Sequence, residues 1–419
     1  MSAAEPRWHL SPPIWINDPN GLIHRDGTWH AFYQCNPFGA HWGSMSWGHA
    51  TSTDLLTWTP HPVALPGADG EDIFSGSCVA APASVVASWP DAPALGDADE
   101  VLVAIYTSHY HGESPRAGIE AQSLAVSTDE GLTWTRYAGN PVLDRGSANF
   151  RDPKVFRHGD GWVMVTVEAE HQQVLIHTSD DLVHWSDAST FGPHHARDGA
   201  WECPDLFRLP IEGTDESAWV LTVSINPGGL HVGSGQQYFV GDFDGRTFTP
   251  RRMSDVEDPR TFDWLDHGRD FYAGVTFADG PDGRVIMLGW LGNWSYAHDA
   301  AEGGRRSLLT LPRELTLVEH RGRLVVRQRI PAEAAAVPVR RLRLLAGQSQ
   351  EVDGITIAFA DGRLEVRRPD VAGLSDFGGT AWAPVDGDAV ELDIHADTGS
   401  LEIATADGLV WFTMATPHI

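Results

Sequence analysis

The chain has 419 residues, with 57 acidic and 29 basic side chains and a formal net charge of -28 at pH 7. This length exceeds that of a usual single hydrophobic core and predicts two domains. So acidic a chain repels phosphate backbones and anionic lipid, which excludes nucleic acid and membranes as partners and favours an uncharged ligand.

The cysteines and the N-terminal residues predict an intracellular protein without disulfide bonds. Cys35, Cys78 and Cys203 are an odd number without a close pair, and they predict neither a disulfide framework nor a zinc site. The first residues lack the basic and apolar regions of a secretory signal, and no stretch reaches the ~20 apolar residues of a membrane span. We therefore expect a soluble cytoplasmic protein without a metal or cofactor.

The first predicted site is the segment 15–21, which reads Trp-Ile-Asn-Asp-Pro-Asn-Gly. Pro19 fixes φ, Gly21 accepts positive φ, and Asn17 can hydrogen-bond nearby backbone, so the turn holds the carboxyl of Asp18 in one direction. Alone, such a segment is more often a solvated turn than a site.

A phrase made of a strand, an Asp turn and a closing aromatic residue recurs at intervals of roughly 50 to 80 residues. Its copies span residues 52–58, 127–134, 178–185 and, more loosely, 241–248. Apolar runs rich in β-branched residues precede the last three copies, at 101–106, 162–167 and 219–223, and a fourth run spans 285–290. These features predict a five-bladed β-propeller in which each phrase is the outer hairpin of a blade and its Trp belongs to the core.

Two later blocks also place an acid beside a proline at a predicted strand end: Arg151-Asp152-Pro153 and Glu202-Cys203-Pro204-Asp205. Each block alone is as well explained by a surface ion pair or a capped turn. Together with Asp18 they give three positioned carboxylates far apart in sequence. That combination suggests glycoside chemistry, in which carboxyls of different roles act on one anomeric carbon.

The sequence changes character after Pro331. Residues 331–338 are typical of a linker or short helix, and strands of period two follow at 355–359, 364–366, 390–394, 401–403 and 410–414. They predict an antiparallel β-sandwich. We thus expect an all-β protein, with a five-bladed β-propeller over residues 1–330 and a compact C-terminal β-sandwich over 331–419. The sandwich is expected to stabilise the propeller flank; accessory sugar binding is the alternative.

The three acid blocks, in this order, resemble the signature of glycoside hydrolase family 32, which comprises invertases, levanases, inulinases and other β-fructofuranosidases. Further matching pieces are Phe32-Tyr33-Gln34, Gly289-Trp290 and the segments 42–50, 74–77, 270–273 and 311–315. The match spans about residues 7 to 318.

The resemblance implies hydrolysis of terminal fructosyl residues with retention, through a covalent fructosyl-enzyme. It implies that Asp18 is the nucleophile, that Glu202 is the acid that later becomes the base for water, and that Asp152 grips fructosyl hydroxyls. We expect Asp18 to stay ionised and the charges of Asp18 and Asp152 to raise the pKa of Glu202. The implied substrate-binding residues are Asn17, Gln34, Trp42, Phe74, Ser75, Arg151 and Trp290.

The chain departs from the family pattern at residues 298–306, where relatives tend to carry a Pro-Thr and a Trp. This segment is expected at the pocket mouth, so the leaving group stays open among sucrose, levan-type (β-2,6) and inulin-type (β-2,1) oligofructosides. Three alternatives also stay open: fructosyl transfer to a sugar acceptor, an inverting arabinanase- or xylosidase-like enzyme, and a sugar-binding propeller without activity.

Overall fold

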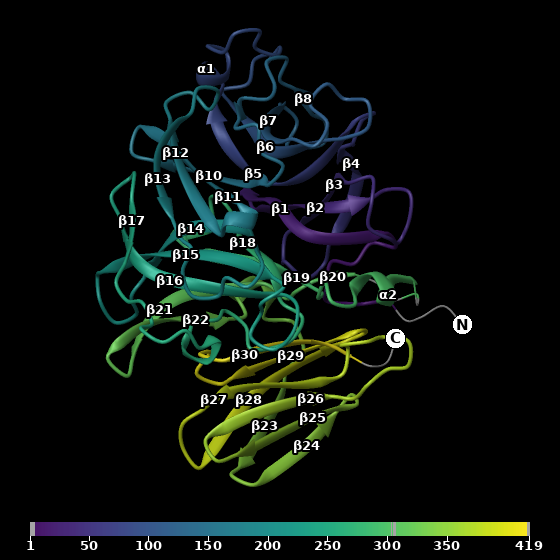
Figure 1. The fold of residues 1–419 in the computed structure, drawn as a ribbon, viewed down its shortest axis with the longest axis vertical. Coiled ribbons are helices and arrows are strands. Elements are labelled where there is room, and N and C mark those ends of the chain that lie inside the picture. Colours follow the sequence, from purple (N-terminus) through teal and green to yellow (C-terminus); the bar gives the residue numbers. More distant parts are fainter. Residues whose placement is uncertain (1–4, 303, 305–306, 417–419) are drawn as a thin grey trace.

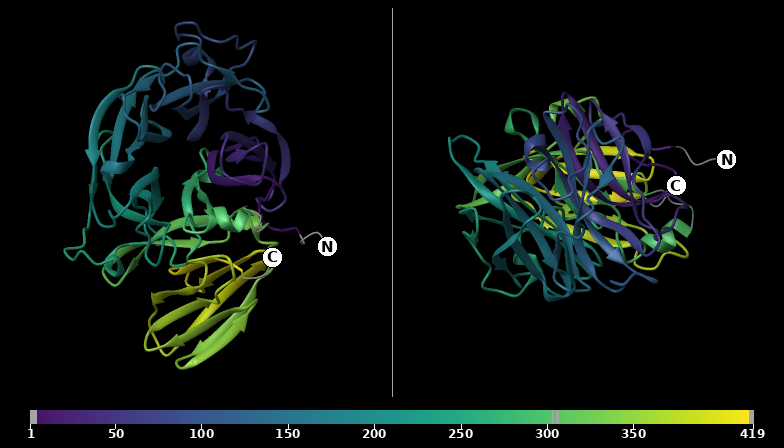
Figure 2. Two further views of the ribbon diagram at one scale, coloured as in Figure 1. Left: turned by 45° about the vertical axis from the view of Figure 1, so that its right-hand side comes forward. Right: turned by 90° about the horizontal axis from the view of Figure 1, so that it is seen from above.

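The computed structural model describes residues 5–302, 304 and 307–416. Within these residues the strands form seven antiparallel sheets; five are arranged in a ring and two stack beside it (Figures 1 and 2). The predicted all-β fold, a five-bladed propeller followed by a sandwich, is confirmed. The helical elements are short: α1 (Ala83–Val86), α2 (Ala297–Glu302), η1 (Ala169–His171), η2 (Pro259–Thr261), η3 (Pro281–Gly283) and η4 (Ala332–Ala334). In the described part of the chain, no helix combines the length and apolar character needed to cross a membrane.

Each blade is built from consecutive strands, numbered here from the innermost strand outward. Blade 1 contains β1 (Trp15–Arg25), β2 (Thr28–Asn36), β3 (Ser46–Ser52) and β4 (Thr59–Leu65). Blade 2 contains β5 (Glu71–Pro82), β6 (Glu100–Tyr110), β7 (Glu120–Ser127), β8 (Thr135–Arg136) and β9 (Leu143–Asp144). Blade 3 contains β10 (Phe150–His158), β11 (Gly161–Glu168), β12 (Gln173–Ser179) and β13 (Ser186–Phe191). Blade 4 contains β14 (Ala200–Pro210), β15 (Ser217–Asn226), β16 (Gly235–Phe243) and β17 (Phe248–Pro250). Blade 5 contains β18 (Tyr272–Thr276), β19 (Val285–Leu291), β20 (Leu308–Leu309), β21 (Arg313–His320) and β22 (Arg323–Arg329).

Every innermost strand is irregular near its start, where its pairing with the second strand of the blade shifts register. The shifts lie at residues 16–19, 73–76, 151–154, 202–205 and 272–275. At a bulge one strand carries an additional residue, which bends the strand and re-aims side chains. The predicted carboxylates Asp18, Asp152 and Glu202 all lie at such shifts, so the same irregularity positions all three.

The repeated phrases are the hairpins between the third and fourth strands of blades 1 to 4, as predicted. In the first three, a serine hydroxyl donates to the Asp two residues later, at 3.0, 2.8 and 3.2 Å. The same Asp accepts backbone N–H groups, which closes the turn. The closing Trp58, Trp134 and Trp185 are only half-buried and pack at the edge of the core.

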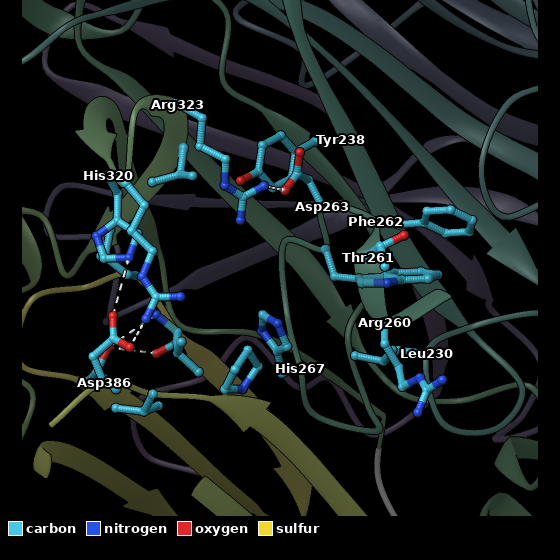
Figure 3. A pocket seen from close by; sticks show the side chains of 18 of the residues that line it. Leu230, Tyr238, Arg260, Thr261, Phe262, Asp263, His267, His320, Arg323 and Asp386 are labelled. Atoms are coloured by element: carbon cyan, nitrogen blue, oxygen red, sulfur yellow. Dashed lines mark hydrogen bonds and ion pairs between the residues drawn. The ribbon is translucent and has the colours of Figure 1, made fainter. Parts of the chain in front are cut away.

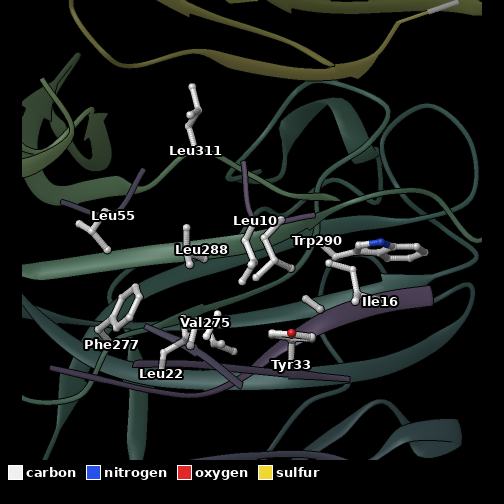
Figure 4. Packing of buried hydrophobic residues seen from close by; sticks show 14 of the residues in the cluster. Leu10, Ile16, Leu22, Tyr33, Leu55, Val275, Phe277, Leu288, Trp290 and Leu311 are labelled. Atoms are coloured by element: carbon white, nitrogen blue, oxygen red, sulfur yellow. The ribbon is translucent and has the colours of Figure 1, made fainter. Parts of the chain in front are cut away.

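Blade 5 closes the ring onto blade 1. The N–H of Ala278 donates to the carbonyl of Leu22 at 2.8 Å, and the N–H of His24 donates to the carbonyl of Ala278 at 3.0 Å. An apolar cluster fills the space between the two blades, with Ile16 and Leu22 from blade 1 facing Val275, Leu288 and other residues of blade 5 (Figure 4). This closure fixes the start of β1, which carries Asp18.

The C-terminal sandwich packs two four-stranded sheets face to face. One contains β23 (Arg340–Leu345), β28 (Ala389–Asp397), β29 (Ser400–Thr405) and β30 (Trp411–Ala415), and the other contains β24 (Gln348–Val352), β25 (Ile355–Ala360), β26 (Arg363–Arg368) and β27 (Gly379–Pro384). The alternating residues that predicted β25, β26, β28, β29 and β30 form its core. Strands β23, β24 and β27 were not predicted. The domain division at residue 330 stays a prediction.

Buried charges join the sandwich to blade 5. The fully buried guanidinium of Arg313 contacts Asp266 Oδ2 and Glu402 Oε2, both at 2.9 Å. His9 Nε2 lies 3.2 Å from Glu402 Oε1, so the segment before β1 joins the same network. Arg368 of the sandwich contacts Asp270 Oδ2 at 2.6 Å. Arg313 and Asp270 belong to segments that match the family pattern. In the structure, both form ion pairs with residues of the sandwich and so attach it to the propeller.

Candidate active site

A cavity of about 400 Å³ lies where the innermost strands of blades 1 to 4 begin. It is lined by Asn17, Asp18, Gln34, Trp42, Phe74, Ser75, His109, Glu120, Arg151, Asp152, Glu202, Trp294 and His298. The three predicted carboxylates, which are far apart in the sequence, therefore meet in one cavity. Six of the seven predicted binding residues line it with them.

Asp18 is held by hydrogen bonds from three sides. Ser75 Oγ donates to its Oδ2 at 2.6 Å, Asn17 Nδ2 donates to its Oδ1 at 3.1 Å, and the Cys203 thiol lies 3.4 Å from Oδ2. Gly21 has φ +51°, as the turn predicts, and a Cβ there would lie 2.8 Å from the ring of Phe32. The carboxyl thus points in one direction because both its turn and its donors are fixed.

Asp152 sits in a strained conformation for a non-glycine residue, with φ +62°. Its Oδ2 accepts the backbone N–H of Cys203 at 2.8 Å, and its own N–H donates to Thr107 Oγ1 at 2.9 Å. Cys203 likewise has positive φ, +47°. The Asp152 carboxylate therefore ties the bulged strands β10 and β14 together. These contacts hold Asp152 in its strained backbone conformation.

Glu202 is oriented by two donors. The guanidinium of Arg151 donates to its Oε1 at 3.0 and 3.2 Å, and the hydroxyl of Tyr272 donates to its Oε2. Arg151 also contacts Glu120 Oε2 at 3.1 Å, so it joins the two glutamates. The Glu202 side chain keeps one quarter of its surface exposed, which leaves it able to meet a ligand in the cavity.

Burial raises the pKa of both aspartates that line the cavity. Burial raises the pKa of Asp18, and the nearby charge of Glu202 acts in the same direction, whereas the hydrogen bonds from Ser75 and Asn17 lower it. Burial raises the pKa of Asp152 to about 8, with the charges of Glu202 and Asp18 adding to the rise and Arg151 opposing it. In both aspartates the loss of solvent access is the largest cause, because burial disfavours the charged form of a carboxyl.

The cavity wall differs from the predicted one at Trp290. Its side chain is 1% exposed and packs behind the cavity, with its ring 6.1 Å from that of Trp15 and 4.8 Å from that of Trp294. It does not line the cavity; Trp294 does. His298, from the segment in which the chain departs from its relatives, also lines the cavity and stacks on Trp15 at 5.6 Å. Gly303, Arg305 and Arg306 of that segment lie outside the described residues.

Sequence reasoning also missed His109 and Glu120, which come from β6 and β7 and carry no motif. The ring of His109 stacks on Phe74 at 4.5 Å and 3°, and its Nδ1 lies 3.5 Å from Glu120 Oε1. Tyr272 belongs to a segment that matches the family pattern, but the sequence did not predict its contact with Glu202. No local pattern reports these contacts, because those of His109 depend on how the strands of blade 2 pair and that of Tyr272 with Glu202 depends on how blades 4 and 5 pack.

Asp205, the second acid of its block, is structural. Its fully buried carboxylate accepts from the N–H and hydroxyl of Thr276 at 2.7 and 2.8 Å and lies 3.2 Å from Lys154 Nζ. Lys154 is the single lysine of the chain and is buried here. This contact joins blades 3, 4 and 5 below the cavity.

A second cavity, of about 350 Å³, lies between blades 4 and 5 and the sandwich (Figure 3). Arg323 and Asp263 form an ion pair on one wall, and Asp386 of the sandwich faces His320 on another. None of the predicted site residues lines it. The three predicted carboxylates therefore line the first cavity and not the second.

Comparison with known proteins gives the family. The model described as the N-terminal domain of glycosyl hydrolases family 32 matches residues 9–328. The chain belongs to glycoside hydrolase family 32. The resemblance seen in the acid blocks is thereby confirmed, and all three blocks fall inside the matched region.

Individual family 32 proteins are similar over most of this chain. The levanase of Bacillus subtilis (strain 168) is 42% identical over 361 residues, which cover 85% of this chain and 50% of the levanase. The extracellular exo-inulinase of Aspergillus niger is 43% identical over 337 residues, covering 74% of this chain and 62% of the exo-inulinase. The chain thus spans only half to less than two thirds of the length of these curated relatives.

Solved family 32 structures match the whole fold. The crystal structure of the exo-inulinase of Aspergillus awamori superposes with a TM-score of 0.88 and 32% identity, covering 100% of this chain and 94% of that one. The β-fructofuranosidase of Schwanniomyces occidentalis complexed with fructosyl-erythritol gives a TM-score of 0.85 and 30% identity, covering 99% and 91%. Both domains of the fold are therefore shared, including the sandwich.

Proposed function

We propose that this protein is a retaining β-fructofuranosidase, which releases terminal fructosyl residues from neutral fructose-containing sugars. The observation that carries the proposal is the meeting of Asp18, Asp152 and Glu202 in one cavity, with each acid at the bulge of a different blade. The family membership and the fructosyl-erythritol held by the Schwanniomyces occidentalis relative support it.

In the first step, a carboxylate oxygen of Asp18 bonds to the anomeric carbon of the fructosyl group. The bond from that carbon to the leaving oxygen breaks, and Glu202 gives its proton to this oxygen. In the second step, water attacks the anomeric carbon, Glu202 takes the proton of the water, and the ester bond to Asp18 breaks. Free fructose leaves, and both carboxyls return to their first state.

The surrounding residues fit these roles. Asp152 is fixed by Cys203 and can accept sugar hydroxyls, a contact that strengthens as positive charge develops on the ring. Gln34 already donates to the carbonyl of Ile73 at 3.0 Å, which leaves its oxygen for a hydroxyl. Phe74 and Trp42 supply an apolar wall for the C–H face of the sugar.

The decisive experiment is product analysis on sucrose, levan and inulin, with the anomer of the first-released fructose followed by NMR. Release of the β-anomer supports a retaining mechanism, and release of the α-anomer would assign the cavity to an inverting enzyme instead. Short oligomers in place of free fructose would indicate endo cleavage, and longer products would indicate transfer. The relative rates on sucrose, β-2,6 and β-2,1 fructans then identify the preferred leaving group. The cytoplasmic location expected from the sequence stays a prediction.

A further inference from the structure

A groove of about 870 Å³ lies beside the active-site cavity, at the end of the blades where the innermost strands begin. Its walls are three connections: residues 37–46 between β2 and β3, residues 66–72 leading into β5, and residues 111–115 after β6. The groove shares no lining residue with the cavity. It therefore extends outward between blades 1 and 2 as a separate surface.

The groove and the cavity are lined by nearby positions of the same segments. Three times, a residue that lines the cavity is two positions away from one that lines the groove: Phe74 and Asp72, His109 and His111, Trp42 and Ser44. Asp72 and Phe74 both belong to β5, and residues two apart on a strand lie about 7 Å from each other. The groove thus begins about one such step beyond the rim formed by Trp42, Phe74 and His109.

Phe38 stands in the groove as an uncovered aromatic ring on a fixed turn. Its side chain is 84% exposed. The backbone beneath it is ordered, because buried Asn36 accepts the N–H of Phe38 at 2.9 Å and donates to the carbonyl of His41 at 2.8 Å. The N–H of Trp15 donates to the carbonyl of Gly39 at 2.9 Å. A fixed apolar ring of this kind matches the C–H face of a sugar.

Polar groups face the same space. Asp72, whose side chain is about one-fifth exposed, lies 3.7 Å from His111 Nε2, and Asp69 and Glu113 line the groove with them. Carboxylates accept hydrogen bonds from sugar hydroxyls, whereas three acids together repel an anionic polymer. The combination of ring and carboxylates selects a neutral polyhydroxylated chain.

We propose that this groove binds the residues of a fructan chain on the leaving-group side of the cleaved bond, with Phe38 as the stacking platform and Asp72 as the hydroxyl acceptor. The proposal rests on the proposed function, because it takes the cavity as the fructosyl subsite. It adds a preference for long substrates, since only a chain that extends past the rim of the cavity can reach the groove.

The test compares Phe38→Ala and Asp72→Asn with the parent enzyme on sucrose, inulin and levan, the two fructans having matched lengths. In each variant the ratio of kcat/KM for a long fructan to kcat/KM for sucrose is expected to fall about tenfold. A fall with one fructan alone also supports the proposal and identifies the linkage that the groove accepts. Unchanged ratios for both fructans in both variants would overturn it.

Leu132→Ala is the matched control, because Leu132 is an exposed apolar side chain in the hairpin between β7 and β8, outside both cavities. An equal fall of the ratio in this control would also overturn the proposal. If the parent releases fructose from no sugar, the proposed function fails instead. The groove is then judged by calorimetric titration of long inulin and levan into the parent and Phe38→Ala, where equal affinities would overturn it.

Discussion

Ser75 Oγ donates a 2.6 Å hydrogen bond to Asp18 Oδ2, so blade 2 holds the carboxylate that blade 1 carries. The bond opposes the effect of burial on the Asp18 pKa, because it stabilises the ionised form. The proposed role of Asp18 as nucleophile requires the ionised carboxylate, so this contact should help to set the acidic limit of activity.

Ser75→Ala should therefore move the acidic limb of the kcat/KM profile to higher pH. Loss of the donor removes a contribution that lowers the Asp18 pKa, so the pKa rises and ionisation needs a higher pH. The profile is measured with sucrose over the acidic range. Ser75→Thr keeps a hydroxyl and should keep the limb near its original place; a limb that moves to lower pH in Ser75→Ala would contradict the prediction.

Asp18→Asn should keep the fold and reduce turnover by about three orders of magnitude or more, because covalent catalysis is lost while the cavity keeps its shape. Initial rates on sucrose and thermal unfolding are the measurements. Asp26→Asn is the control, because this substitution makes the same chemical change at an exposed position in the turn between β1 and β2. Activity of Asp18→Asn within about tenfold of the control would remove Asp18 from the nucleophile role.

Glu202→Ala should reduce cleavage of sucrose far more than cleavage of an activated fructoside whose leaving group needs no proton. The second step still lacks its base, and azide should restore part of the rate with the activated substrate by attacking the fructosyl-enzyme. Steady-state rates with and without azide test this. Equal losses on both substrates without rescue would point to another acid.

His298→Ala should change the relative kcat/KM values for sucrose, β-2,6 and β-2,1 substrates by about tenfold or more, because His298 lines the cavity and belongs to the segment expected to contact the leaving group next to the cleaved bond. Inhibition by fructose should stay nearly constant. Asp299→Asn, at the neighbouring exposed position in α2, is the control. A large change in fructose inhibition would instead place His298 in the fructosyl subsite.

The buried contacts of His9 with Asp397 and Glu402 should make the free energy of unfolding fall between pH 6.5 and 9. Hydrogen bonds and charges from Asp397 and Glu402 outweigh the lowering by burial and raise the pKa of His9 to about 9. A raised pKa stabilises the fold fully below pH 6.5 and loses its effect as pH rises through 9, a change of roughly 3 kcal/mol. The pKa of Glu402 is lowered to about 2, so its contribution is constant above about pH 4.5.

Urea unfolding of the parent and of His9→Gln at pH 6 and pH 9 measures this effect. The variant should lose much less stability over the interval than the parent. Histidines of lowered pKa, such as His267 at about 4, complete most of their contribution below pH 6.5. Asp152, whose pKa is raised to about 8, also makes stability fall as pH rises toward 8, but it does so in parent and variant alike, so the difference between the two proteins isolates His9. Parallel losses in parent and variant would show that other groups control the alkaline side.

Local chemistry made much of this molecule predictable. The Asn-Asp-Pro-Asn-Gly turn revealed Asp18, and the repeated Asp turns revealed the blades, because both are encoded within a few residues. The strands β23, β24 and β27 were missed because their exposed and half-buried residues carry little apolar alternation. His109 and Glu120 could not be found, since they are brought to the cavity by the pairing of strands within blade 2, and the contact of Tyr272 with Glu202 depends on how blades 4 and 5 pack. Trp290 was misplaced because a large aromatic beside a motif suits a core as well as a pocket, and its burial favours the core.

The ion pairs of Arg313 and Arg368 limit how the two parts of this protein can be exchanged for those of a relative. A different sandwich joined to this propeller must supply a carboxylate where Glu402 lies and a guanidinium where Arg368 lies. Without them, the covered charges of blade 5 lose their partners, at a cost of about 3–5 kcal/mol for each broken pair. A chimaera that exchanges blade 5 and the sandwich together should therefore keep more stability than one cut at residue 330.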